Sequence, residues 1–427
     1  MSAPARPRSH TALAAALALA AAGAGAEATA QDDLRDVVHL RNGKEVRGRL
    51  AQPFQAGEVL VVQGGKRVRL KAEDVERTVT VAAAVREFCE RRLAMRQSPR
   101  AQWFLVEWAR ARGLEHLARL QATWLVLQTG DERAHEFLGH KKKDDRWLWR
   151  HEDRWYDLDQ LRTVLVREPM LLQGERFAVR CEGHLDANVD ALFDLERLGV
   201  WWMDSYGHDL LLDEVLAPIE VRVARDATEF PKWGFRPVPF YTPAPHGDVV
   251  QTFYAGPDPV RPRLLFAAAM QGLLYHTMIG SVDPRDERDR VCPWLEIGVG
   301  MLAEETLQGD PGFAAPGPPR AQDLQALQAL GRDYRLTHLL HLPMYGGFYL
   351  MDDTPTAINW SAAAMFVQFL LQSDNIPDTR APFLAYVRAA LRERQGDSSS
   401  LFDATMGRRV EDLEQPFRKW LEKQAGY

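Results

Sequence analysis

Two apolar stretches of this sequence contain the residues whose types and spacing most resemble a metal-binding site. The first is Gly272-Leu273-Leu274-Tyr275-His276, and the second is Cys292-Pro293-Trp294-Leu295-Glu296-Ile297-Gly298. Imidazole and carboxylate groups are the usual nitrogen and oxygen ligands of zinc. His276 and Glu296 are therefore the candidate metal ligands. Two ligands are fewer than the three that a catalytic zinc site takes from its protein.

Two helices are expected to position these residues. The first spans residues 262–279, with Pro262 in its first turn and Gly280 just past its end, which is the usual asymmetry of a helix. The second spans residues 294–307. Positions 272 and 276 are four apart and share a helical face, whereas one step along a helix turns a side chain by about 100°. Glu296 therefore cannot face the point that position 297 faces.

The two stretches resemble the two motifs of gluzincin-type zinc peptidases, in particular a family of exported bacterial proteins of unknown function. In that family the first helix carries His-Glu-x-x-His, whose two His bind zinc and whose Glu is the general base. The second helix opens with Trp-Leu-x-Glu-Gly-x-Ala and supplies a further ligand. Trp294, Leu295 and Gly298 keep the frame of that second motif.

The resemblance implies a degenerate metal site. His276 stands at the second His, but Gly272 replaces the first His, Leu273 replaces the catalytic Glu, and Ile297 replaces the ligand Glu. The resemblance extends over residues 172–427 and includes Asn359-Trp360-Ser361 near the end of the chain. It implies a gluzincin-like domain with no catalytic residue, no cofactor-binding residue and no bound metal.

The remaining histidines leave a displaced metal site open as an alternative. The available imidazoles besides His276 are His208, His246, His338 and His341. The last two are three apart in a helical stretch, and Asp352-Asp353 beyond a Gly-Gly loop are the nearest carboxylates. We expect this stretch to pack as an amphipathic helix. No Gly-x-Ser-x-Gly motif and no glycine-rich phosphate loop occurs.

The hydrophobic periodicity predicts an α+β protein in three parts. Residues 36–80 read as a small all-β barrel with a hairpin at Asn42-Gly43. Residues 82–165 read as a short helical segment that resembles a tetratricopeptide-type repeat, too short to stand alone, so it is expected to pack on its neighbour. Residues 171–427 form the gluzincin-like domain, with strands before helices.

The expected elements of the last part follow from alternation and from threefold and fourfold spacing. Three strands and six helices are predicted, and residues 230–246 are expected to be a loop. The strands are 176–181, 218–223 and 248–254, and the helices are 186–203, 262–279, 294–307, 360–372, 380–394 and 410–423. Lys141-Lys142-Lys143-Asp144-Asp145 is expected to be a charged turn, followed by a packed tryptophan cluster at Trp147, Trp149 and Trp155.

The first thirty residues predict a secretory signal peptide. A basic start is followed by the apolar run Ala12 to Ala22 and by the small-residue site Ala28-Thr29-Ala30. The mature protein is therefore expected to be exported, either periplasmic or secreted. A second long apolar run is absent from the sequence, so no integral membrane segment is expected after cleavage.

Charge limits the classes of partner that the chain is expected to bind, and the cysteine spacing limits the sites that it is expected to form. The net charge of −6 predicts neither a nucleic-acid footprint nor a polybasic membrane patch. Cys89, Cys181 and Cys292 are far apart and lack C-x-x-C spacing, which favours three buried thiols.

The sequence as a whole indicates a non-catalytic, peptidase-like protein that binds a polypeptide or a cell-envelope component. The partner is expected between the helix of His276 and the strand at Val249–Tyr254, where it would add as a strand. The alternatives are an active zinc metallopeptidase with a displaced metal site and a purely structural envelope scaffold.

Overall fold

The computed structural model describes most of the chain after residue 35. The described ranges are 36–51, 57–63, 66–95, 98–215, 217–230, 238–243, 247–255, 260–280, 292–309, 334–349, 353–371, 379–393 and 398–424. The predicted signal peptide, His246 and Asp352 lie outside these ranges. The chain forms two compact units, Met1–Ala83 and Ala84–Tyr427.

The first unit is an antiparallel sheet in the order β4-β3-β2-β1-β5. Its strands are β1 (Asp36–Leu40), β2 (Glu45–Ala51), β3 (Glu58–Gln63), β4 (Lys66–Lys71) and β5 (Val75–Val79). The predicted hairpin at Asn42-Gly43 is confirmed, and Gly43 supplies the positive φ of 80° that the turn needs.

The part predicted to be a small barrel is all-β as expected, but no closed barrel is found among the strands that the structure describes. Closure requires the two edge strands of a sheet to pair with each other. Here the short turn η1 (Ala72–Asp74) leads from β4 into β5, but β5 pairs with β1 instead. Val38, Leu50 and Val61 form the small core of this open sheet.

The second unit begins with helices that cover part of a larger sheet. They are α2 (Val81–Ala94), α3 (Pro99–Ala111), α4 (Glu115–Thr129) and α5 (Glu132–Leu138), and α2 starts before the boundary between the units. Ser98 and Asp131 cap α3 and α5 by accepting from backbone N–H groups. The predicted packing on the following part is confirmed, because α4 contacts α7 and the Arg92 guanidinium lies 3.6 Å from the Phe193 ring centroid.

A three-stranded sheet interrupts the helices where a charged turn was expected. Its strands are β6 (Lys141–Lys143), β7 (Arg146–His151) and β8 (Arg154–Tyr156), followed by α6 (Leu158–Val164). The prediction of a turn was wrong because Lys141–Lys143 pair with Arg146–Leu148, and only Asp144 and Asp145 turn, both at positive φ. The packed tryptophan cluster is confirmed for Trp149, which is 4% exposed.

The large sheet has the order β12-β13-β11-β10-β9. Its strands are β9 (Met170–Gln173), β10 (Phe177–Cys181), β11 (Ile219–Ala224), β12 (Phe240–Thr242) and β13 (Val249–Phe253). The three predicted strands are β10, β11 and β13, which run parallel, and the long helix α7 (Leu185–Leu210) connects the first two. The prediction of a loop over residues 230–246 missed the short antiparallel edge strand β12.

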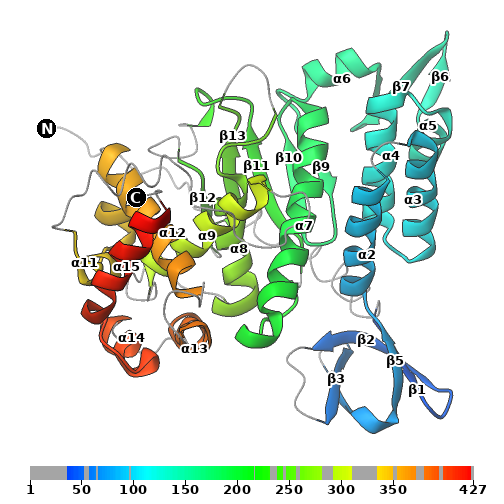
Figure 1. The fold of residues 1–427 in the computed structure, drawn as a ribbon. Helices are drawn as coiled ribbons and strands as arrows, with labels where there is room; N and C mark the ends of the chain where they lie inside the picture. The colour runs from blue at the N-terminus through cyan, green and yellow to red at the C-terminus, as the bar shows by residue number, and fades with distance from the viewer. Residues whose placement is uncertain are drawn as a thin grey trace, which may run out of the picture. The chain divides into compact units, whose positions relative to one another are not determined.

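Helices follow the sheet and form most of the remaining core (Figure 1). They are α8 (Leu265–Leu274), the π-helical turn η3 (Tyr275–Ile279), α9 (Pro293–Gly309), α11 (Leu336–Leu340), the π-helical turn η6 (Met344–Phe348), α12 (Asp353–Leu371), α13 (Arg380–Leu391), α14 (Ser398–Met406) and α15 (Glu411–Gln424). The predicted start at Pro262 was three residues early. Among the described helices none is long and apolar enough to cross a membrane.

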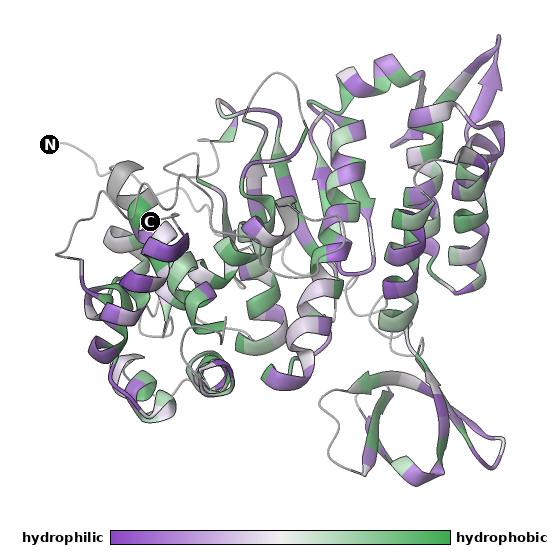
Figure 2. Cartoon of the chain, viewed as in Figure 1, coloured by the Kyte–Doolittle hydropathy of each residue, from purple (hydrophilic) through white to green (hydrophobic). Residues whose placement is uncertain are grey.

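Helix α8 is buried all round, and Figure 2 shows it mostly in the hydrophobic colour. Two glycines of α9 allow the close approach of its neighbours. A Cβ on Gly300 would lie 2.8 Å from the Ala267 carbonyl oxygen of α8, and a Cβ on Gly298 would lie 2.8 Å from the Ala363 carbonyl oxygen of α12. The α9 helix is therefore wedged between α8 and α12.

A buried carboxylate also joins α9 to α8. Glu304 is 0% exposed, and its Oε2 accepts from the backbone N–H of Phe266 at 2.8 Å and of Ala267 at 3.0 Å. The first N–H groups of a helix have no partner within the helix, and Leu264, in the N-cap position, offers no side-chain acceptor. The Glu304 side chain takes that role, and its negative charge suits the positive end of the α8 dipole.

Replacement of Glu304 by Leu is expected to lower the free energy of unfolding by about 3 kcal/mol, because two buried donors lose their acceptor. Urea unfolding followed by far-UV circular dichroism measures this loss. The control is Glu422→Gln on the exposed face of α15, which is expected to change stability by less than ~0.5 kcal/mol. Equal stability of the Glu304→Leu variant and the parent would contradict the capping role.

Candidate functional site

The four positions aligned with peptidase motifs lie in or beside the core. Leu273 and Ile297 are 0% and 1% exposed. Gly272 faces the sheet, where a Cβ would lie 3.2 Å from Ile219 Cγ2 and 3.3 Å from Val250 Cγ2. An imidazole at position 272 would therefore require these side chains to move.

His276 lies beyond the end of α8, in the π-helical turn η3. Of these four positions it is the one whose side chain is partly exposed. Its Nε2 lies 2.7 Å from Asp248 Oδ1. Because a carboxylate only accepts, Nε2 carries a proton and donates it to Asp248. The Nε2 lone pair is thus not available to a metal in this arrangement.

Asp248 receives a second donor from the edge strand. The Tyr241 hydroxyl donates to the same Oδ1 at 2.5 Å. The hydrogen bond from His276 is the main cause that lowers the pKa of Asp248, while burial and the neighbouring carboxylate raise the pKa of the Tyr241 hydroxyl. The Asp248 side chain is 44% exposed, so the cluster Tyr241–Asp248–His276 presents an ionised carboxylate to solvent.

The sheet edge beside this cluster is closed to a further strand. The strand expected to border the partner, β13, is interior, since it pairs with both β11 and β12, and that prediction was wrong. The edge is β12, whose Tyr241 N–H donates to Gln271 Oε1 at 3.2 Å.

The residues that flank Tyr241 complete this closure. Alternate residues along an extended chain have the same orientation, so the backbone nitrogens of Pro239 and Pro243 point the same way as that of Tyr241. As prolines, neither of them carries an N–H group. From residue 239 to residue 243 the outward edge of β12 therefore offers no free N–H group. Prolines on an edge are a known protection against added strands.

The other candidate ligands are dispersed. Glu296 is buried, at 3% exposure, on α9. His208 is fully exposed beside Asp209, His338 and His341 are exposed, and the Nε2 of His341 lies 2.7 Å from Ser399 Oγ. Within the described ranges, no three His, Cys, Asp or Glu side chains are grouped so that they could hold a metal ion.

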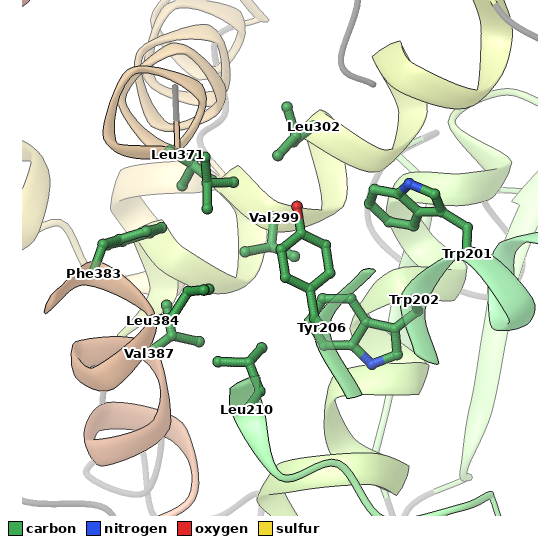
Figure 3. A pocket seen from close by; sticks show the side chains of 11 residues that line it. Trp201, Trp202, Tyr206, Leu210, Val299, Leu302, Leu371, Phe383, Leu384 and Val387 are labelled. Carbon is green, nitrogen blue, oxygen red and sulfur yellow. The ribbon is translucent and has the colours of Figure 1, made fainter. Parts of the chain in front are cut away.

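Two cavities lie elsewhere in the second unit. The first is between α7 and helices α9, α12 and α13, and Figure 3 shows its apolar walls, which include Trp202, Leu302 and Phe383. Its volume is about 10 Å³, close to the lower limit for a single water, and an apolar void of this size stays dry. It is a packing gap between helices rather than a ligand site.

The second cavity opens where β10 and β11 end, the edge at which parallel sheets commonly bind ligands. Its volume is about 330 Å³, and its walls include His184, Arg162 and Arg225. Arg162 pairs with Asp186 at 2.8 Å and Arg225 with Asp226 at 3.2 Å, so the arginine charges are balanced within the protein. No motif in the sequence indicates this cavity.

The prediction of three buried cysteines is confirmed, and none of the three forms a disulfide. Burial raises the pKa of Cys89 and of Cys181 to about 12. A thiol that stays protonated is a poor nucleophile and a poor metal ligand. The chain matches no protein-family model and no curated protein.

Sequence reasoning singled out His276 but missed Tyr241 and Asp248. Tyr241 lies in the segment read as a loop, between two prolines, and Asp248 was counted only as the start of a strand. The only local signal is the position of Asp248 directly before a strand, and nothing in the sequence near Tyr241 indicates a site. The carboxylate lies 28 positions before the imidazole, which periodicity alone cannot connect.

The Asp248→Asn variant is expected to be less stable than the parent at neutral pH, by about 1 kcal/mol or less because the carboxylate is half exposed. A lowered pKa means that ionised Asp248 favours the folded state above the ordinary aspartate pKa near 4. This contribution is lost as the pH falls through the lowered value, so the stability difference is expected to close in acid. Urea unfolding at a series of pH values measures it.

The control is Asp209→Asn, since the Asp209 side chain is also 44% exposed and lies 3.4 Å from His208. Asp209 also lies 3.6 Å from Arg380, but exposed pairs at such distances contribute little to stability. A smaller loss is expected there. A stability difference for Asp248→Asn that stays constant down to acid pH would contradict the role of the ionised carboxylate.

Proposed function

We propose that this chain is an exported, non-catalytic protein whose peptidase-like domain binds a polypeptide or a cell-envelope component. The observation that carries the proposal concerns Gly272 and His276, the two positions at which the resembled peptidases have their zinc-binding histidines. The space of the first is filled by Ile219 and Val250 around Gly272, and the Nε2 of His276 is committed to Asp248. Packing and hydrogen bonding thus replace a metal site at these positions.

The binding mode that fits the geometry is side-chain recognition rather than strand addition. The outward edge of β12 lacks free donors, so a polypeptide would gain only acceptor contacts there. Asp248 instead offers a half-exposed, ionised carboxylate fixed by two donors. The ligand group suited to it is a cation, such as a lysine or arginine side chain or the amino terminus of a polypeptide.

The two rival functions predict different measurements. A zinc metallopeptidase with a displaced site would retain zinc, with ligands drawn from His208, His246, His338 and His341. A purely structural scaffold would bind neither zinc nor peptides at Asp248.

Protein purified without chelator is expected to contain well under one zinc per chain, and its thermal stability is expected not to change on zinc addition. Elemental analysis and thermal unfolding measure both quantities. Near-stoichiometric, tightly held zinc would overturn the non-catalytic proposal and direct His→Ala substitutions to the remaining histidines.

A variant with the family's ligands put back provides the matched comparison. Gly272→His, Leu273→Glu and Ile297→Glu together are expected to lower the free energy of unfolding by more than about 3 kcal/mol, because a large and two charged groups enter a filled core. No zinc site is expected to form. Tight zinc binding by this variant at unchanged stability would contradict the inference that the packing around position 272 excludes a histidine ligand.

Lysine-rich peptides are expected to bind the parent more tightly than glutamate-rich peptides of equal length, and Asp248→Asn is expected to reduce that binding about tenfold or more. Fluorescence anisotropy with labelled peptides measures both affinities. Asp209→Asn is again the control and is expected to bind like the parent. Equal affinity of Asp248→Asn and parent would exclude Asp248 as the contact.

A further inference from the structure

The sheet β6-β7-β8 concentrates positive charge in a chain that is acidic overall. Its three strands contain six Lys or Arg residues and no Asp or Glu, whereas the net charge of the chain is −6. The composition predicts no polybasic patch because it averages over all residues. Folding brings these cations together on paired strands, and Figure 2 shows hydrophilic colour over β6.

The strand register sorts the residues of this sheet into two faces. One face packs inward: Trp149 and His151 are 4% and 7% exposed, and Trp147 stacks on His135 with 4.4 Å between ring centroids. The cross-strand pairs Lys141↔Leu148, Lys143↔Arg146 and Arg150↔Trp155 define the other face, since directly opposed residues point the same way. We call Lys141, Lys143, Arg146, Leu148, Arg150 and Trp155 the cationic face.

The charges of the cationic face are open to solvent. Lys141 and Lys143 are exposed, and the side chains of Arg146 and Arg150 are 77% and 65% exposed. Four acidic residues occupy the two hairpin turns, at 144–145 and 152–153, outside the strands. Arg150 lies 3.5 Å from one of them, Asp153, and Arg146 lies 3.7 Å from Asp157; exposed pairs at these distances are worth little, so they compete weakly with an external anion.

The apolar residues of the cationic face help to distinguish between two polyanions that it could bind, an anionic lipid surface and a nucleic acid. Leu148 and Trp155 are partly exposed among the cations, and tryptophan with lysine and arginine is the residue set enriched at membrane–water interfaces. Single-stranded nucleic acids are bound through aromatic rings on which their bases stack. One face of the Trp155 ring is already occupied, because the Lys141 ammonium lies 4.3 Å from its centroid.

We propose that the cationic face docks this protein onto the surface of a membrane that contains anionic phospholipids. The Lys and Arg side chains contact lipid phosphates while their stems, Leu148 and the Trp155 edge lie against the interface. The docking is peripheral, through one exposed sheet face. It is independent of the binding proposed at Asp248, because different elements carry the two surfaces.

The test is vesicle sedimentation at low ionic strength, with vesicles of phosphatidylcholine alone and of phosphatidylcholine mixed with phosphatidylglycerol. The parent is expected to bind only the mixed vesicles and to be released by salt. The variant Lys141→Gln, Lys143→Gln and Arg146→Gln is expected to bind on the order of a hundredfold more weakly, from the contribution of three cations near an anionic surface.

The control variant removes the same number of exposed cations elsewhere, with Arg409→Gln, Lys419→Gln and Lys423→Gln. It is expected to bind the mixed vesicles within about twofold of the parent, since distant charges are screened. All three proteins are purified in the same form, so their N-termini are identical, and equal melting temperatures show that each is folded.

Three results would overturn the proposal. The first is equal binding of the parent to both kinds of vesicle, and the second is equal binding of the parent and the cationic-face variant. The third is binding of the parent to a single-stranded oligonucleotide without binding to mixed vesicles, which would assign the face to nucleic acid instead.

Discussion

The arrangement of the second unit depends on how α9 holds α8. The Glu304 carboxylate accepts from two buried N–H groups at the start of α8. Gly300 lets the backbones of the two helices approach closely, because it has no side chain. A helix that is buried on every side cannot rely on solvent to satisfy its first turn. With α8 fixed in this way, Gln271 reaches the N–H of Tyr241 and holds the edge strand, and η3 presents His276 to Asp248.

Much of the fold could be predicted from the sequence because its signals are local. Asn42-Gly43 specifies a hairpin by its turn geometry. The runs that become β10 and β11 show the alternation of apolar and polar residues that is typical of strands. The missed strands lack such signals. Strand β12 lies between prolines, and its Tyr241 N–H donates to Gln271 of α8, a contact that the local sequence does not indicate. Strand β6 consists of three lysines, which form a strand by pairing with β7.

The candidate site also has a part that local sequence predicts and a part that depends on tertiary contacts. The residue types alone indicate that Gly272, Leu273 and Ile297 are not metal ligands, since their side chains carry no donor atoms. The present partners of His276 are not readable in that way, because Asp248 and Tyr241 reach it through tertiary contacts across β12 and β13. Gly298 is a further example: its place in a peptidase-like motif suggested a retained frame, while the structure gives it a packing reason in the contact with α12.

The surroundings of Gly272 bear on whether this region offers a cavity. A position with room for an imidazole would have open space beyond its Cβ. Here methyl groups of Ile219 and Val250 lie within about 3.3 Å of the Cβ position, and the tyrosine ring of the edge strand lies at 3.4 Å. Close packing of this kind stabilises the domain and removes the cavity together. The hydrogen bonds on Asp248 have the same effect on His276, so the chemistry that this region offers is that of a fixed carboxylate.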